Sequence, residues 1–130
     1  MNLPRIVVSA PHRSSGKSTV TTGLCAALGR RGLTVQPFKK GPDFIDPMWL
    51  SAAAGRQCRT LDFFMMGEDE ILRTFSRHAP ADGISLVECN HGLHDGIDVE
   101  GSDSSAALAK LLASPVLLVV NARRMSRGVA

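Results

Sequence analysis

The feature that most constrains the fold is the segment of residues 9–19, Ser-Ala-Pro-His-Arg-Ser-Ser-Gly-Lys-Ser-Thr, which joins an apolar run to a helical pattern. The apolar run, residues 5–9, predicts a short buried strand, and residues 16–32 predict a helix. A strand that leads into small residues ending in Gly-Lys-Ser is the context that gives a phosphate-binding loop (P-loop) its meaning. Backbone N–H groups and the positive end of the helix hold the phosphates, Lys17 reaches the terminal phosphates, and the Ser18 hydroxyl ligates Mg²⁺.

The loop departs from the usual pattern in one respect, because Pro11 stands where the motif normally begins with glycine. The simplest alternative is a polar turn in which Ser14 or Ser15 caps the helix. A capping turn explains neither Lys17 nor the flanking strand and helix. We therefore predict that a nucleotide is bound by the P-loop residues Ser14, Ser15, Gly16, Lys17, Ser18 and Thr19.

Along the rest of the chain, apolar runs alternate with helical patterns, without an internal repeat. Continuous apolar strands separated by helices favour an α/β fold with a mostly parallel central sheet buried on both faces. Pro37 indicates that its strand ends near an edge or a bulge. The further strands are expected at residues 33–38, 84–88 and 115–120, and the helices at residues 48–54, 68–78 and 102–113.

Polar residues gather where these strands end, which is the side on which parallel sheets bind ligands. Phosphoryl transfer needs cations and Mg²⁺ to hold the phosphate charge. Lys17 and Lys39 (or Lys40) can supply the cations, while Ser18, Asp43 and Glu88 can supply oxygen ligands to Mg²⁺. We predict Lys17, Lys39, Asp43 and Glu88 as catalytic residues, with Asn121 at the same rim.

Some of these residues could have purely structural roles instead. Asp43 and Asp46 stand beside Pro42 and Pro47, where aspartate commonly serves turn formation. Of the two lysines at residues 39–40, at least one is expected to lie in solvent at the end of its strand.

Composition is that of an ordinary globular chain: 130 residues, 44% hydrophobic and 21% charged, with a net charge of +3. One domain with a real core is expected, spanning residues 1–130. Nucleic-acid binders cluster basic residues on one surface, but here they are scattered, and no stretch is long and apolar enough for a membrane span. We expect no nucleic-acid partner, no membrane partner and a cytoplasmic location.

The three cysteines, Cys25, Cys58 and Cys89, form no Cys-x-x-Cys pair and are odd in number, as is typical of a reducing compartment. Cys25 is expected to be a small core residue of the first helix. Cys89 has His91 and His94 nearby, but the spacing matches no standard zinc finger, which favours a polar site loop over a zinc site.

These motifs resemble the N-terminal ATP-binding domain of the cobyrinic acid a,c-diamide synthase family, in the dethiobiotin-synthetase-like group of P-loop proteins. The similar stretches cover nearly the whole chain, and Gly-Pro-Asp-Phe-Ile-Asp-Pro at residues 41–47 is far more specific than the P-loop. Pro11 is typical of this family. The further similar segments are residues 10–11 leading into 14–19, 35–39, 55–56 with 61–62, Glu88 with 92–93 and 95–96, and 101–102 before 107–109.

The resemblance implies a three-layer P-loop NTPase-like fold and ATP-dependent amidation of a tetrapyrrole. ATP would phosphorylate a side-chain carboxylate of cobyrinic or hydrogenobyrinic acid, and ammonia would then displace the phosphate, as in cobalamin biosynthesis. By position, Lys17, Ser18 and Thr19 would contact phosphate and Mg²⁺, Lys39 would be a transition-state cation, and Asp43 and Glu88 would be Mg²⁺-site carboxylates.

Several features depart from the family pattern. Cys89 stands where the family usually has glycine, Asn90 and His91 replace an apolar pair, and Asn121 replaces an aspartate. The family continues into a glutamine amidotransferase domain that these 130 residues do not contain. The chain is therefore expected to be incomplete as a glutamine-dependent synthetase, whether as a truncated product, a fragment or a partnered subunit.

Three alternatives remain open. Residues 39–43 with Met48-Trp49-Leu50, and the Glu-Cys-Asn-His-Gly loop, also resemble a siroheme-amidating branch with the same chemistry. A partition-type ATPase would normally carry a second lysine early in the P-loop, where this chain has His12 or Arg13. A nucleotide-binding module without turnover is the third alternative. The oligomeric state is also undecided, with a homodimer among the alternatives.

Overall fold

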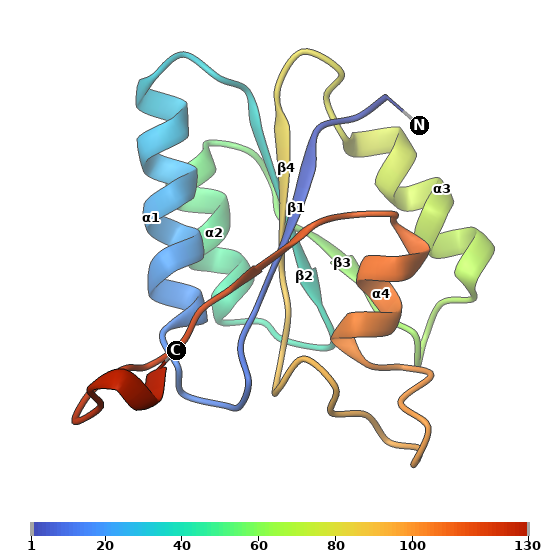
Figure 1. The fold of residues 1–130 in the computed structure, drawn as a ribbon. Helices are drawn as coiled ribbons and strands as arrows, with labels where there is room; N and C mark the ends of the chain where they lie inside the picture. The colour runs from blue at the N-terminus through green and yellow to red at the C-terminus, as the bar shows by residue number, and fades with distance from the viewer. Residues whose placement is uncertain (1, 130) are drawn as a thin grey trace.

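The chain forms three layers, in which a five-stranded sheet is sandwiched between two pairs of helices (Figure 1). The computed structural model describes residues 2–129. The strands are β1 (Arg5–Ser9), β2 (Val35–Lys40), β3 (Arg59–Leu61), β4 (Ile84–Glu88) and β5 (Val116–Leu118). The helices are α1 (Lys17–Arg30), α2 (Asp46–Ala54), α3 (Glu68–His78) and α4 (Ser105–Leu111), followed by the 3-10 turn η1 (Arg127–Val129).

All strand pairs are parallel, which confirms the predicted parallel sheet, and the strand order is β3-β2-β4-β1-β5. At the centre, Val87 of β4 pairs with Val7 of β1 on one side and with Phe38 of β2 on the other. Helices α1 and α2 cover one face of the sheet, and α3 and α4 cover the other (Figure 1). Because the strands are parallel, their carboxyl ends meet at one edge, where the P-loop also begins.

Each face of the sheet has its own hydrophobic core, because successive side chains of a strand point to opposite faces. Leu86 of β4 packs in a cluster with Cys25 of α1, whereas its neighbour Val87 packs with Phe38 and Phe75 on the α3 side. The rings of Phe38 and Phe75 are 5.1 Å apart between centroids. The prediction that Cys25 is a core residue is confirmed, since it is fully buried.

Strand β2 lies two residues later than expected, and this shift matters for the site. Lys39 and Lys40 belong to the strand, where Lys39 pairs with Thr60 of β3 and with Glu88 of β4. The expectation that at least one of the two lysines lies in solvent is therefore wrong, because their residues are only 3% and 8% exposed.

The prediction that Pro37 marks a strand end near an edge or a bulge is also wrong, because β2 is an interior strand with Pro37 in its middle. The missing N–H is tolerated because pairing with β3 starts only at Phe38. Before that point the side-chain amide of Gln36 donates to the carbonyls of Pro37 and Gln57, both at 2.9 Å. A side chain thus replaces backbone pairing where the neighbouring strand has not yet begun.

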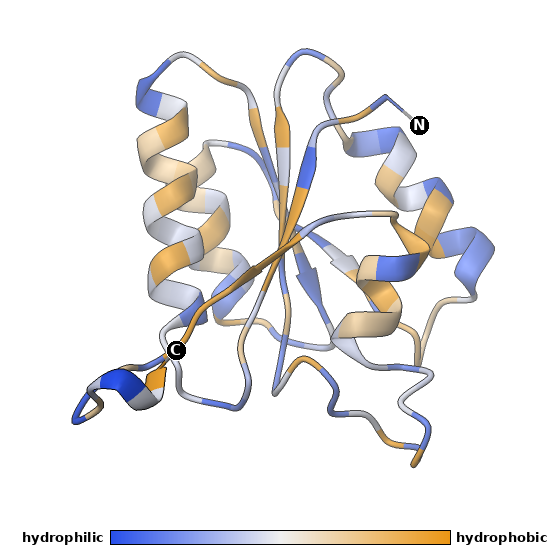
Figure 2. Cartoon of the chain, in the orientation of Figure 1, coloured by the Kyte–Doolittle hydropathy of each residue, from blue (hydrophilic) through white to orange (hydrophobic). Residues whose placement is uncertain are grey.

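Further differences concern strands β3 and β5 and helix α4. The three-residue strand β3 was not predicted, because it is too short to show a periodic pattern. Helix α4 is shorter than expected, at seven residues. Strand β5 is hydrophobic along its length (Figure 2) but is not buried on both faces, with Leu117 40% exposed. No helix among residues 2–129 is long and apolar enough to cross a membrane.

Candidate functional site

The P-loop places open backbone at the start of α1. Gly16 precedes the helix with φ 91°, in the left-handed region that favours glycine, and no side chain caps the helix. The alternative in which Ser14 or Ser15 caps the helix is therefore not what the structure shows, since the Ser15 hydroxyl donates to the His12 carbonyl at 2.9 Å instead. The six predicted P-loop residues line one hollow of about 190 Å³, namely Ser14, Ser15, Gly16, Lys17, Ser18 and Thr19. Free N–H groups at a helix start make this hollow suitable for phosphate.

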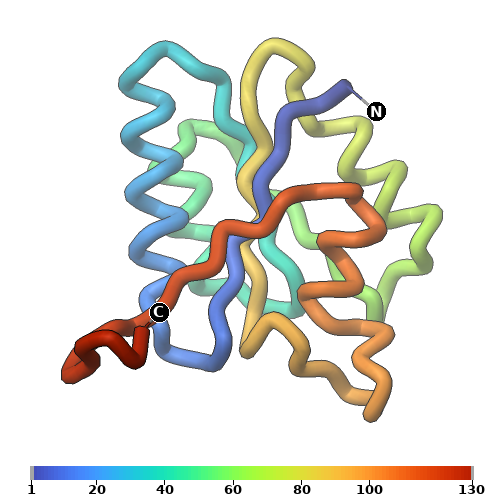
Figure 3. Tube along the Cα trace, viewed as in Figure 1, coloured from blue at the N-terminus to red at the C-terminus, as the bar shows by residue number. Residues whose placement is uncertain are grey.

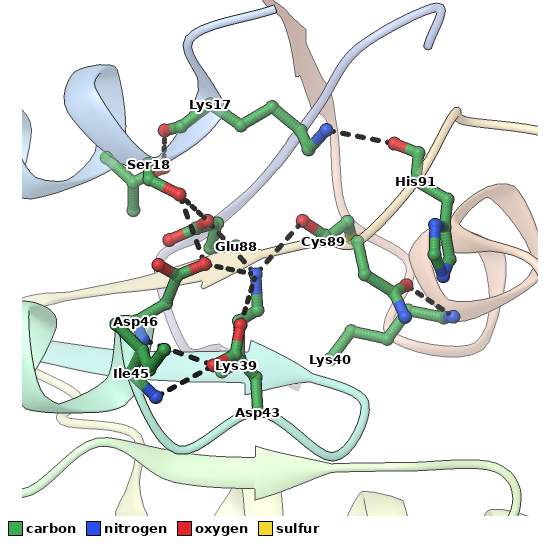
Figure 4. Close-up of polar contacts among 12 residues, drawn as sticks. Lys17, Ser18, Lys39, Lys40, Asp43, Ile45, Asp46, Glu88, Cys89 and His91 are labelled. Carbon is green, nitrogen blue, oxygen red and sulfur yellow. Dashed lines mark hydrogen bonds and ion pairs between the residues drawn. The ribbon is translucent and has the colours of Figure 1, made fainter. Parts of the chain in front are cut away.

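Lys17 lies across the mouth of this loop. Its side chain is largely buried, and its ammonium donates to the backbone carbonyl of His91 at 3.0 Å (Figure 4). Burial lowers the pKa of Lys17, and the nearby Lys39 ammonium lowers it further. A phosphate in the loop would supply the negative charge that Lys17 lacks here.

Lys39 is the centre of a polar cluster that joins α1, β2, β4 and the loop before α2 (Figure 4). Its ammonium lies 3.0 Å from Glu88 Oε1, 3.1 Å from Asp46 Oδ2 and 3.9 Å from Asp43 Oδ2. Burial alone would lower the pKa of Lys39, but the charge and hydrogen bond of Glu88, with those of Asp46, raise it overall. Lys39 therefore stays charged in a nearly dry position.

Ser18 connects the P-loop to this cluster. Its hydroxyl lies 2.6 Å from Glu88 Oε1 and 3.1 Å from Asp46 Oδ2. A hydroxyl carries one proton, so it can donate to only one of these carboxylates at a time. The motif residue of α1 and a carboxylate 70 positions later in the chain are therefore in direct contact.

Glu88 is the most buried acid of the cluster, at 1% exposure. Burial raises its pKa, which Lys39 and Ser18 only partly offset. Its Oε1 atom accepts from both of those residues, whereas its buried Oε2 atom has no partner among the described residues. An unpartnered carboxylate oxygen beside a serine hydroxyl and a second carboxylate is a donor set that fits Mg²⁺.

Asp43 and Asp46 have different surroundings. Asp43 Oδ1 accepts from the backbone N–H groups of Ile45 at 2.8 Å and Asp46 at 3.2 Å, which is the turn role expected beside proline. Asp46 begins α2 and bonds directly to Lys39 and Ser18. Asp46 is partly buried, which would raise its pKa, but hydrogen bonds from Lys39 and Ser18 bring it below the usual value. The sequence did not decide whether Asp46 serves the turn or the polar cluster, and the structure places it in contact with the cluster.

Lys40 points to the opposite face of the sheet from Lys39, as alternation along a strand requires. Its ammonium donates to Asn90 Oδ1 at 3.0 Å, and burial lowers its pKa. Together with Asn90 and Asp62 it lines a separate pocket of about 330 Å³. The two lysines that sequence reasoning could not tell apart therefore serve two different pockets.

Asn121 is at the same edge of the sheet but not in the Lys39 cluster. The chain after β5 passes beside the P-loop (Figure 3), where Asn121 lines an open hollow with His12, Arg123 and Arg124. Within residues 2–129, no group of three or more His, Cys, Asp or Glu side chains forms a ready metal cluster. Any metal would therefore be held jointly by protein carboxylates, by the Ser18 hydroxyl and by the phosphates of a bound nucleotide.

Comparison with known proteins bears directly on this geometry. The profile described as "CobQ/CobB/MinD/ParA nucleotide binding domain" matches residues 6–125, which includes every residue of the cluster. The chain belongs to this family. It is a nucleotide-binding domain family, in agreement with a P-loop that opens onto a polar cluster.

The chain is also similar to curated proteins over nearly its whole length. It is 57% identical over 128 residues to the cobyrinate a,c-diamide synthase of Magnetococcus marinus and 47% identical over 131 residues to that of Syntrophotalea carbinolica. It is 48% identical over 129 residues to the hydrogenobyrinate a,c-diamide synthase of Streptomyces coelicolor. These matches cover 98–100% of this chain but only 26–28% of each relative. The resemblance to cobyrinic acid a,c-diamide synthases is confirmed over nearly the whole of this chain.

Proposed function

We propose that this chain is the ATP-binding domain of a tetrapyrrole amide synthetase. One observation carries the proposal: the Glu88 carboxylate accepts hydrogen bonds from both the P-loop Ser18 hydroxyl and the Lys39 ammonium at the carboxyl edge of the sheet. The names of the similar proteins support an amide-forming reaction on cobyrinate or hydrogenobyrinate. Siroheme remains an alternative substrate of the same chemistry.

In this proposal the residues divide the work by charge. The P-loop N–H groups and Lys17 bind the phosphates, and Lys39 stabilises negative charge that develops as the terminal phosphoryl group is transferred. Ser18 and Glu88, with Asp46 and Asp43 near them, would hold Mg²⁺. When bound, Mg²⁺ neutralises phosphate charge during the transfer.

The proposed reaction has two steps. An oxygen of the substrate carboxylate attacks the γ-phosphorus of ATP, and the bond between that phosphorus and the β–γ bridging oxygen breaks. ADP is released, and the carboxylate carries the phosphoryl group as an acyl phosphate. Ammonia then attacks the acyl carbon, phosphate leaves, and loss of a proton from nitrogen gives the amide. Activation is needed because a free carboxylate has no good leaving group for ammonia to displace.

The chain spans little more than a quarter of the length of the relatives it matches. We propose that ammonia comes from glutamine through an amidotransferase domain outside these residues. The 130 residues would then bind and orient ATP, and complete turnover would need the remaining parts of the synthetase.

Calorimetric titration tests the proposal. The protein should bind ATP in the presence of Mg²⁺, and Lys17→Ala should abolish this binding, because the Lys17 ammonium is the cation of the P-loop motif that reaches the terminal phosphates. Retained affinity in Lys17→Ala with an unchanged fold would contradict the proposal. ATP binding without any tetrapyrrole binding or amide formation in the full-length synthetase would favour a nucleotide-binding module.

A further inference from the structure

Arg13 is a second P-loop cation that the proposed mechanism has not used. Its side chain is exposed, and its Nε donates to His91 Nδ1 at 2.6 Å, which joins the P-loop to the loop after β4. The same His91 accepts the Lys17 ammonium on its backbone carbonyl at 3.0 Å. One residue therefore holds both P-loop cations, one by its ring and one by its backbone.

The charges around this point are unevenly paired. Arg13, Lys17 and Lys39 all line one hollow of about 280 Å³, together with Asp43, Asp46 and Glu88. All three carboxylates lie within 4.0 Å of Lys39, and among the described residues none forms an ion pair with Arg13 or Lys17. Two cations on the P-loop therefore form no ion pair among the described residues, at the position where a nucleotide would bring its phosphates.

The hydrogen bond to His91 leaves most of the Arg13 side chain available. Only Nε is engaged, and the four N–H groups of the two Nη nitrogens have no protein partner among the described residues. A guanidinium held at Nε loses side-chain freedom before any ligand arrives, so less entropy is lost on binding phosphate. The backbone of His91 is in the left-handed region, at φ 51°, which is uncommon for a residue other than glycine.

From these contacts we propose that Arg13 binds the terminal phosphate of the nucleotide beside Lys17, and that His91 is a positioning residue that orients Arg13. The inference rests on the proposed nucleotide function and extends it to Arg13 and to His91 of the loop after β4. The ligand chemistry is a triphosphate, since a diphosphate would leave the Arg13 position empty.

The test compares ATP with ADP on the same protein in calorimetric titrations with Mg²⁺. Arg13→Gln should weaken ATP binding about tenfold or more, because a charge-assisted hydrogen bond is lost, and should change ADP binding less than about twofold. Arg31→Gln is the matched control, because it removes the same charge at the other end of α1, and it should change neither affinity. Circular dichroism and the melting temperature show whether each variant is folded.

His91 is tested by a conservative pair. His91→Asn keeps a side-chain acceptor for Arg13 and tolerates positive φ, so the preference for ATP over ADP should survive. His91→Leu removes the acceptor and should reduce that preference about threefold or more, with little further effect in an Arg13→Gln background. Equal behaviour of His91→Asn and His91→Leu would overturn the positioning role.

Two failures are distinguishable. If the wild-type protein binds neither nucleotide, the proposed function falls and the role of Arg13 falls with it. If the wild-type protein binds ATP and Arg13→Gln binds it equally well, or loses ATP and ADP to the same extent, only the Arg13 inference is overturned.

Discussion

The Lys39 ammonium and the Glu88 carboxylate are in contact at 3.0 Å, with both side chains almost completely excluded from solvent. They come from adjacent strands, where Lys39 and Glu88 are partners in the β2–β4 register. The pairing thus results from sheet register, and the polar cluster is built into the backbone arrangement of the domain.

Glu88→Gln tests whether this carboxylate belongs to a Mg²⁺ site. Glutamine has nearly the same shape and its carbonyl can still accept from Ser18 and Lys39, but it is a weak ligand for a divalent cation. We expect ATP binding without Mg²⁺ to be preserved and the gain in affinity on adding Mg²⁺ to shrink by about tenfold or more. Titrations of ATP with and without Mg²⁺ measure this gain, and Glu68→Gln on the exposed start of α3 is the control. An unaltered Mg²⁺ gain in Glu88→Gln would remove Glu88 from the site.

Asp46→Asn should harm the site more than Asp43→Asn. Asp46 bonds directly to Lys39 and Ser18, whereas Asp43 Oδ2 is 3.9 Å from the Lys39 ammonium and its Oδ1 serves the turn. Asparagine at position 43 can still accept the two turn hydrogen bonds. The Mg²⁺-dependent ATP affinity of both variants gives the ranking, and a larger loss in Asp43→Asn would show that Asp43 moves into the site on ligand binding.

Asp46 also predicts a pH dependence of stability. Its native pKa is lowered by Lys39 and Ser18 against the opposing effect of burial, while the unfolded value is about 3.9. The unfolded chain therefore binds this proton more readily, so the stabilisation is present above about pH 4 and is lost as the pH falls through the native pKa. Urea denaturation at a series of pH values should show that Asp46→Asn lacks this part of the acid sensitivity. Parallel curves for the wild type and Asp46→Asn would contradict the prediction.

Gly92 allows the loop after β4 to lie against the P-loop. A Cβ atom at this position would be 2.5 Å from the Pro11 carbonyl oxygen, a distance that forces the two loops apart. Gly92→Ala should reduce the free energy of unfolding by about 1–3 kcal/mol and weaken ATP binding, because His91 and the P-loop separate. Gly23→Ala in α1 meets no atom within 4 Å and should instead stabilise the protein by about 0.5–1 kcal/mol. Urea denaturation and nucleotide titration of both variants make the comparison.

The cysteines should be unreactive in the native protein. All three are free and buried, and burial raises the pKa of Cys25 to about 11 and that of Cys58 to about 12. Thiolate is the reactive form, so at pH 8 only about one Cys25 side chain in a thousand is ionised. A chromogenic disulfide reagent should label none of the thiols quickly at pH 8 and all three after denaturation in guanidinium. Rapid labelling of the native protein would show that one of the two cores opens.

Local patterns predicted most of the elements correctly. Helix α3 begins at Glu68 and ends at His78 as expected, because its apolar face repeats at helical spacing and acids occupy its first turn. Strand β4 also matches, since a short apolar run ending in a carboxylate is a strong local signal. Strand β3 could not be predicted, because three residues hold no period and the strand exists only through pairing with β2.

The sequence alone predicted the P-loop at residues 9–19, with the strand before it and the helix after it. This was possible because the strand, the small-residue loop and Gly-Lys-Ser all lie within one short segment. The membership of Asp46 in the site, the separate pockets of Lys39 and Lys40, and the bridge from Arg13 to His91 were decided only by tertiary structure. The physical reason is sheet register: it brings residue 88 to residue 39, 49 positions apart, and the alternation of a strand sends neighbouring lysines to opposite faces. A pattern read along the sequence shows neither how far apart two residues lie in space nor on which face of the sheet a side chain lies.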